Sequence, residues 1–108
     1  MIDYEEFISV DMRVGTIKSA RTNELARKPA YILEIDLGDL GTRMSSAQIT
    51  KLYSAADLVG RQVICVVNFP PKQVAGVRSE VLVLGVDSYS GIVLLSVDRQ
   101  VANGQRVY

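Results

Sequence analysis

Polar and hydrophobic positions alternate along much of the chain with the period of two that is typical of a half-buried β-strand. Residues 12–20, which begin Met-Arg-Val-Gly-Thr-Ile, have this β-rich character. The alternation recurs over residues 31–37, where Leu33 and Ile35 lie on one face and Glu34 lies on the other. The sequence therefore predicts two strands, joined by a polar connection over residues 21–29.

Further runs of β-forming residues predict the rest of a sheet. Gly38-Asp39-Leu40-Gly41 indicates a hairpin turn, because glycine tolerates the positive φ that such turns need. Residues 62–67, Gln-Val-Ile-Cys-Val-Val, form an almost continuous apolar run, as expected of a buried strand. Two prolines and a glycine in residues 68–77 predict a structured loop. The remaining strands are expected at residues 42–47, 62–67, 79–86 and 92–97.

The first residues predict a short amphipathic helix. Asp3 is suited to the N-cap position, and Glu6 three residues later completes an acidic variant of the capping box. Tyr4, Phe7 and Ile8 fall at i, i+3 and i+4, so they share one apolar face. Such a face packs either on its own domain or against a partner subunit.

A second helical segment is expected within residues 47–59. Ser54 and Asp57 have capping-box spacing, and Gly60 ends the segment. Five or more short strands with a helix between the third and the fourth follow the order of an OB-fold, a five-stranded Greek-key barrel. No internal repeat and no linker divides the sequence. We therefore expect residues 1–108 to form one all-β domain.

Composition places the chain among ordinary globular proteins. It has 108 residues, of which 48% are hydrophobic and 22% are charged, enough to build a core without covalent cross-links. A single cysteine cannot form an internal disulfide. The N-terminus is acidic, unlike a signal peptide, and no apolar stretch approaches the roughly 20 residues that span a bilayer. We expect a cytoplasmic protein that does not insert into a membrane.

The residue types argue against catalysis. The chain has no histidine, which excludes Ser-His-Asp and Cys-His arrangements and histidine-based metal sites. Cys65 lies in the most apolar run, where a free cysteine usually serves as a small core residue. Glu34 and Asp36 share one strand face. Their position is better explained by a strand whose polar side faces solvent than by a pair of catalytic carboxylates. We expect no enzyme activity, no cofactor and no metal site.

Charge is unevenly distributed although the net charge is zero. The first eleven residues contain four acidic residues and no basic one, so the remainder carries twelve basic residues against eight acidic ones. A weakly basic body permits local contacts with phosphate groups. Scattered, solvated lysines and arginines explain the same pattern equally well.

Three polar or irregular stretches border strand ends, where an OB-fold places its ligand contacts. They are residues 45–50, 68–72 and 76–80. In and beside them are two lysines that can contact phosphate, an aromatic ring that can stack on a base, and two hydrogen-bonding groups. These side chains are Lys51, Lys72, Phe69, Asn68 and Ser79.

Some of the same residues also have a purely structural interpretation. Pro70 and Pro71 can stiffen a connection, Phe69 can complete the core, and Gly76 can permit a tight turn. For Phe69 and the prolines this interpretation is preferred, because loop aromatics more often complete small cores. For Asn68 and Ser79 the alternatives remain open.

Three stretches resemble a known family in their order and spacing: DMRVGTIKSA, SSAQITKLY and VVNFPPKQVAGVRSEVLVLG. They are similar to single-domain tRNA-binding proteins, which are related to the tRNA-binding modules of methionyl- and phenylalanyl-tRNA synthetases. Within that group the sequence is most similar to the CsaA branch, described as export-related chaperones. The resemblance covers residues 3–108, and its most specific part is the ungapped block 45–85.

The resemblance implies an OB-fold that pairs as a symmetric homodimer through terminal elements, which here include residues 1–11. It also implies that one tRNA is held across the dimer by its shape, without reading of base sequence. Matching the family's block to this chain implies RNA contacts at Ser46, Lys51, Asn68, Lys72, Arg78 and Ser79.

At two places the sequence differs from the tRNA-binding members and agrees with the chaperone branch. Where the tRNA-binding members have Ser-x-Gly-Met, this chain has Ser79-Glu80-Val81-Leu82, and a carboxylate that faces phosphate would oppose binding. Where those members often have a Ser/His-containing segment that ends in Lys-Leu, this chain has Ala-Arg-Lys-Pro-Ala at residues 26–30.

Three functions therefore remain open. The dimer can bind tRNA by shape and backbone charge, as a chaperone or as a dedicated tRNA-binding protein. It can bind unfolded or export-destined polypeptides, which requires an apolar groove. It can also be a structural dimerisation module. The residues that could line a peptide groove are Phe69, Pro70, Val74, Val77 and Leu82.

Overall fold

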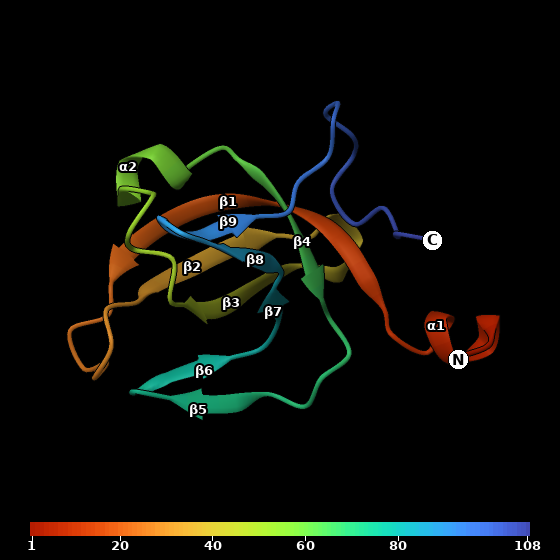
Figure 1. Ribbon diagram of the computed structural model, residues 1–108, viewed down its shortest axis with the longest axis horizontal. Helices are drawn as coiled ribbons and strands as arrows, with labels where there is room; N and C mark the ends of the chain where they lie inside the picture. The colour runs from red at the N-terminus through yellow and green to blue at the C-terminus, as the bar shows by residue number, and fades with distance from the viewer.

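A five-stranded antiparallel sheet curls into a nearly closed barrel in the computed structural model, which describes all residues from Met1 to Tyr108 (Figure 1). The strand order is β3-β2-β1-β4-β7. This is the predicted all-β barrel of the OB-fold type. The strands of the barrel are β1 (Met12–Thr22), β2 (Tyr31–Asp36), β3 (Thr42–Ala47), β4 (Gln62–Val66) and β7 (Leu82–Val83).

Two hairpins and three short helical segments complete the chain. One hairpin joins β5 to β6, and the other joins β8 to β9. The helix α2 lies between β3 and β4, as predicted. The bounds are α1 (Tyr4–Ile8), η1 (Gly38–Leu40), α2 (Ala55–Leu58), β5 (Lys72–Val74), β6 (Val77–Ser79), β8 (Gly85–Ser88) and β9 (Gly91–Leu94).

The barrel closes where the segment after β6 meets β3. The backbone N–H of Glu80 donates to the Met44 carbonyl oxygen at 2.8 Å, and the Ser45 hydroxyl donates to the Val81 carbonyl oxygen at 2.8 Å. Because Ser45 is fully buried, its hydroxyl needs this partner. The sheet thus has no free edge along this part of β3.

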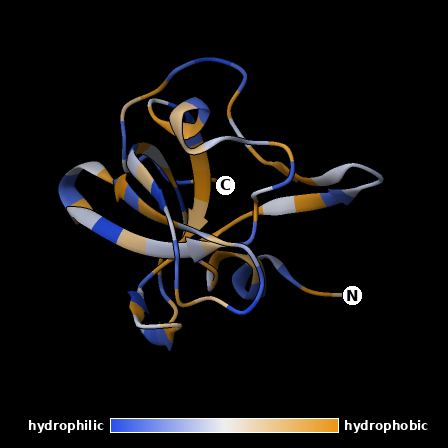
Figure 2. Ribbon diagram, turned by 90° about the vertical axis from the view of Figure 1, so that its left-hand side faces the viewer, coloured by the Kyte–Doolittle hydropathy of each residue, from blue (hydrophilic) through white to orange (hydrophobic).

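Alternating side chains from the barrel strands fill the core. Ile17 of β1, Leu33 and Ile35 of β2, and Val63 of β4 are completely buried, and Leu58 of α2 covers one end of the barrel. Figure 2 shows hydrophobic stretches along the barrel strands and hydrophilic stretches in many of the connections. The period-two pattern of residues 31–37 therefore identified the buried face correctly.

The N-terminal helix forms as predicted but packs little on the barrel. Asp3 accepts a hydrogen bond from the Glu6 backbone N–H at 2.8 Å, and the Glu6 side chain accepts in return from the Asp3 N–H. No residue of α1 is buried, and the helix projects from one end of the molecule (Figure 1). Tyr4 remains 66% exposed, so the apolar face is not covered by its own domain.

Several predicted boundaries were wrong. Helix occupies only residues 55–58 of the expected 47–59. The preceding loop is held instead by Tyr53, whose carbonyl oxygen accepts from the Tyr31 hydroxyl at 2.8 Å and whose own hydroxyl accepts from the Leu94 N–H at 3.1 Å. These contacts to β2 and β9 fix the loop against the barrel. In addition, β1 extends two residues into the predicted connection and ends at Thr22.

The expected loop at 68–77 contains most of a hairpin. Ala75 and Gly76 both adopt positive φ, 47° and 81°, which lets β5 and β6 pair through a two-residue turn. The expected strand at 79–86 is divided into the end of β6, β7 and β8. Leu84 lies at the second break, where its N–H donates to Ile64 and its carbonyl accepts from Leu95.

The C-terminal segment lies beside the first half of β1. The Val14 N–H donates to the Gln105 carbonyl oxygen at 2.9 Å, and the Val107 N–H donates to the Met12 carbonyl oxygen at 2.9 Å. The two ends of the chain therefore lie at the same end of the molecule (Figure 1).

Candidate ligand-binding groove

A groove of about 490 Å³ opens between the β5–β6 hairpin and β7. Its walls come from the end of β3, the Pro-Pro connection and the residues around β6 and β7. Most of the stretches that sequence analysis singled out therefore meet here. The lining residues are Ser46, Phe69, Pro70, Pro71, Lys72, Val74, Ser79, Glu80, Val81 and Leu82.

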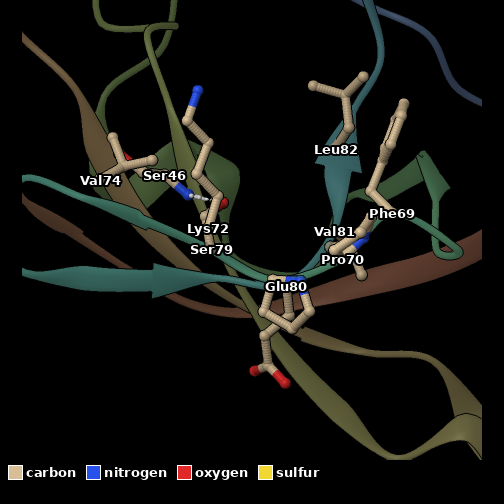
Figure 3. Close-up of a pocket in the computed structure, with 10 residues that line it drawn as sticks. Ser46, Phe69, Pro70, Lys72, Val74, Ser79, Glu80, Val81 and Leu82 are labelled. Carbon is tan, nitrogen blue, oxygen red and sulfur yellow. Dashed lines mark hydrogen bonds between the residues drawn. The ribbon is translucent and has the colours of Figure 1, made fainter.

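Hairpin pairing brings three of the predicted RNA contacts together. Lys72 lies opposite Ser79 in the β5–β6 register, so their side chains share one face. The Ser79 hydroxyl oxygen accepts a hydrogen bond from the Ser46 backbone N–H at 3.2 Å, which joins the hairpin to β3 (Figure 3). Ser46, Lys72 and Ser79 thus form a polar side of the groove.

Apolar side chains form the other side. Phe69 is 55% exposed and Leu82 is 49% exposed. Both side chains point in the same direction as that of Lys72, although they come from the opposite wall of the groove (Figure 3). Phe69 does not belong to the core, so the interpretation that it completes the core was wrong. The barrel closes through Glu80 and Val81 instead, and the ring remains at the surface beside the groove.

The carboxylate of Glu80 points away from the groove (Figure 3). Its Oε1 atom accepts a hydrogen bond from the Met44 backbone N–H at 3.2 Å, while its own N–H donates to the Met44 carbonyl. Glu80 therefore extends the pairing between β3 and the chain after β6. Its charge does not face a ligand in the groove.

The other predicted contacts lie elsewhere. Arg78 is opposite Gln73 and therefore on the other face of the hairpin from Lys72. Val77 shares a face with Val74 but does not line the groove. The Asn68 side chain donates to the Ser9 carbonyl and accepts from the Asp11 N–H, so its amide already has structural partners. Their contacts with RNA or peptide remain predictions.

Lys51 lines a second cavity, of about 430 Å³, that shares no residue with the groove. Of its other members, Gln48 and Thr50 belong to the predicted stretch 45–50, whereas those from the β1–β2 connection and the β8–β9 hairpin were missed. A possible signal was the Asp-Ser-Tyr-Ser-Gly turn, because it carries an exposed tyrosine. The lining residues are Lys28, Pro29, Gln48, Thr50, Lys51, Asp87, Ser88, Tyr89, Gly91 and Ile92.

Most basic side chains have no carboxylate partner. Of the twelve lysines and arginines, only Arg13, Lys18, Arg99 and Arg106 are in ion pairs, which leaves eight unpaired. The Lys72 side chain in the groove is one of the eight. Unpaired cations on a weakly basic body remain available for phosphate or carboxylate groups.

The ionisable groups with shifted pKa values lie outside the groove. The hydrogen bond from Arg13 at 2.6 Å holds the pKa of the Asp11 carboxyl below its ordinary value, and Arg106 adds a weaker attraction. Burial raises the pKa of the Cys65 thiol to about 12. No cluster of His, Cys, Asp and Glu is suited to hold a metal ion. No helix has the length and apolarity to cross a membrane.

Comparison with known proteins identifies the family. The family model described as "Putative tRNA binding domain" matches residues 12–106. The chain belongs to this tRNA-binding domain family. Its stretch of 106 matched residues is 33% identical to methionine–tRNA ligase of Thermococcus onnurineus. That match covers 98% of this chain but only 14% of the ligase, so it concerns a small part of the enzyme.

Solved structures of whole chains match more closely. The crystal structure of chaperone CsaA from Bacillus anthracis is 50% identical, with a TM-score of 0.93 over 100% of this chain and 99% of that one. CsaA from Picrophilus torridus is 46% identical, with a TM-score of 0.94 over the full length of both. A MetRS-related protein from Pyrococcus horikoshii is 29% identical, with a TM-score of 0.88 over 100% of this chain and 98% of that chain. This tRNA-binding domain therefore has the fold of the CsaA chaperones.

Proposed function

We propose that this protein is a CsaA-like chaperone that holds apolar segments of unfolded, export-destined polypeptides in the groove beside β7. The supporting observation is the exposed pair Phe69 and Leu82, which face a polar side that carries Lys72. Large apolar side chains in a concave site that are not needed for the core favour binding of an apolar partner. The similarity to CsaA chaperones along the full chain supports the same proposal.

The two sides of the groove have different tasks in this proposal. Side chains of an extended polypeptide pack against Phe69 and Leu82, which gives affinity without reading a sequence. Lys72, which has no carboxylate partner, attracts backbone carbonyls or acidic side chains of the client. The two-residue turn at Ala75 fixes the hairpin that carries Lys72 and Val74.

A titration of a fluorescein-labelled, unstructured apolar peptide tests the groove. Phe69→Ala removes the largest exposed ring and should weaken binding by about 1–3 kcal/mol, since burial of a large apolar side chain is worth about that much. The matched control is Val86→Ala, because Val86 is also 55% exposed but lies on β8, outside the groove. Equal affinities of wild type and Phe69→Ala would reject the groove as the site.

Membership of the tRNA-binding domain family supports a second function, binding of tRNA. The eight unpaired basic side chains support it too, because they can contact the phosphate backbone without a specific base sequence. Bulk tRNA should bind saturably at about 50 mM salt and more weakly at about 200 mM. Lys72→Ala and Lys51→Ala should each weaken this binding. Absence of binding at the lower salt would leave polypeptide as the ligand.

We further propose that two copies pair through the N-terminal helix. Tyr4 and Ile8 are exposed on a helix with no buried residue, and the C-terminal Tyr108 is exposed at the same end of the molecule. An uncovered amphipathic helix gains by burial against an identical surface. A dimer would place two sets of unpaired cations on one tRNA.

A further inference from the structure

The second cavity lies at the end of the barrel away from α1 and the C-terminus. Lys28 and Pro29 come from the β1–β2 connection, Lys51 comes from the loop after β3, and Tyr89 comes from the β8–β9 turn. Figure 1 shows these three connections at one end of the long axis, opposite the two chain termini. The cavity is therefore well separated from the proposed dimer surface.

The β8–β9 turn is fixed against its neighbour. The Ser88 hydroxyl donates to the Gly91 carbonyl oxygen at 2.6 Å and closes the turn. Gly91 has a φ of 141°, and a Cβ at this position would lie 2.9 Å from the Cβ of Lys51. Glycine is thus needed both for the backbone conformation and for the close approach of the hairpin to the loop. The turn that carries Tyr89 is held beside Lys51.

The Tyr89 side chain has no structural role that explains its position. It is fully exposed at the tip of the turn, and its ring packs on no other aromatic side chain. An exposed aromatic ring on a fixed turn offers a flat face on which a base can stack. Such stacking needs only the π face of the base, so it is compatible with binding that does not read sequence.

The charges around the ring match a nucleotide more closely than a simple anion. Lys28 and Lys51 line the cavity and have no carboxylate partner, so they can contact phosphates. Asp87 lines the cavity too, and its carboxylate would repel a bare phosphate. The same carboxylate can accept hydrogen bonds from the N–H groups of a base. Aromatic ring, cations and acceptor together favour a base with flanking phosphates.

We propose that this cavity binds an unpaired nucleotide of RNA, with its base stacked on Tyr89 and its flanking phosphates on Lys28 and Lys51. The inference rests on the proposed tRNA binding and assigns it a position on the molecule. A single-stranded loop or end of a tRNA supplies the unstacked base that the site requires. Because the cavity and the groove share no residue, this base site lies outside the groove proposed for polypeptide.

The test is a titration of a labelled, unstructured 12-nucleotide RNA followed by fluorescence anisotropy. Tyr89→Ala should weaken binding by at least about fivefold, since stacking of one base contributes about 1–3 kcal/mol. Tyr89→Phe keeps the π face and should bind within about twofold of wild type. Val59→Ala, which truncates an apolar side chain that is 51% exposed and lines neither the groove nor the second cavity, is the control and should change nothing. Inorganic pyrophosphate at millimolar concentration should not compete.

The possible results distinguish failure of this site from failure of the proposed tRNA binding. Wild-type protein that binds neither the oligonucleotide nor tRNA would overturn RNA binding altogether. Wild-type binding that is unchanged in Tyr89→Ala but weakened in Lys72→Ala would overturn only this site and place RNA in the groove. Competition by pyrophosphate with no effect of Tyr89→Ala would show a simple anion site. Thermal unfolding of each variant confirms that it is folded, as expected for exposed positions.

Discussion

The side-chain oxygen of Asn68 accepts a hydrogen bond from the backbone N–H of Asp11 at 3.0 Å, across 57 positions of the sequence. Its amide nitrogen donates to the Ser9 carbonyl oxygen at 2.8 Å. One side chain thus joins the start of the loop that carries Phe69 to the junction between α1 and β1. The groove and the proposed dimer element are connected through these two hydrogen bonds.

Asn68→Ala should lower the free energy of unfolding by about 1–3 kcal/mol, because it removes two hydrogen bonds that each contribute about 0.5–1.5 kcal/mol. Urea unfolding followed by circular dichroism measures the change. Gln73→Ala is a suitable control, since Gln73 is exposed and makes no side-chain hydrogen bond. If Asn68→Ala is as stable as wild type but loses tRNA affinity, Asn68 is a ligand contact and not a structural link.

Asp11 should make stability depend on pH in the acid range. The hydrogen bond from Arg13 lowers the pKa of Asp11 in the folded protein, so the unfolded state binds the proton more readily. The stabilisation is complete above the ordinary pKa of about 3.9 and is lost as pH falls through the lower folded pKa. The difference in unfolding free energy between wild type and Asp11→Asn should therefore shrink below about pH 4.

The control for this experiment is Asp98→Asn. Asp98 is also close to an arginine, Arg99, but both side chains are almost fully exposed, and such pairs contribute little. Its variant should follow the wild-type pH profile. A constant difference between wild type and Asp11→Asn from pH 7 to pH 2 would contradict the role given to the Asp11 carboxylate.

Cys65 should be unreactive in the folded protein. Its side chain is completely buried in β4, and its pKa of about 12 leaves almost no thiolate at pH 8. A thiol reagent such as 5,5′-dithiobis(2-nitrobenzoic acid) should label the native protein only as fast as it unfolds. Full labelling in 6 M guanidinium chloride is the positive control. Rapid labelling of native protein would show that β4 is accessible.

Local signals predicted the parts of the fold that depend on neighbours in sequence. The Asp3 capping box and the glycine turn at 38–41 formed as expected, and β3 has the predicted bounds. The β5–β6 hairpin was missed because alanine rarely adopts the positive φ that Ala75 has here. The second cavity was missed because its residues come from three connections that only barrel closure brings together.

Dimer formation should depend on the apolar face of α1. Replacing Tyr4 and Ile8 together by serine removes most of that face, so the mass measured by light scattering should fall from two chains to one at micromolar concentration. Leu25→Ser is the control, because Leu25 is 73% exposed but lies in the β1–β2 connection at the other end. A wild-type mass of one chain would reject the dimer.

The central claim is that the groove binds apolar polypeptide by packing and not by charge. The most direct test is the affinity of an unstructured apolar peptide for wild type and Phe69→Ala at about 50 and 200 mM salt, with tRNA titrated in parallel. Peptide affinity should change less than about twofold with salt and fall in Phe69→Ala, since packing is not screened by ions. With two phosphate contacts, tRNA affinity should fall by about tenfold. The account would be contradicted if the affinity for peptide fell with salt as the affinity for tRNA does and was the same in wild type and Phe69→Ala.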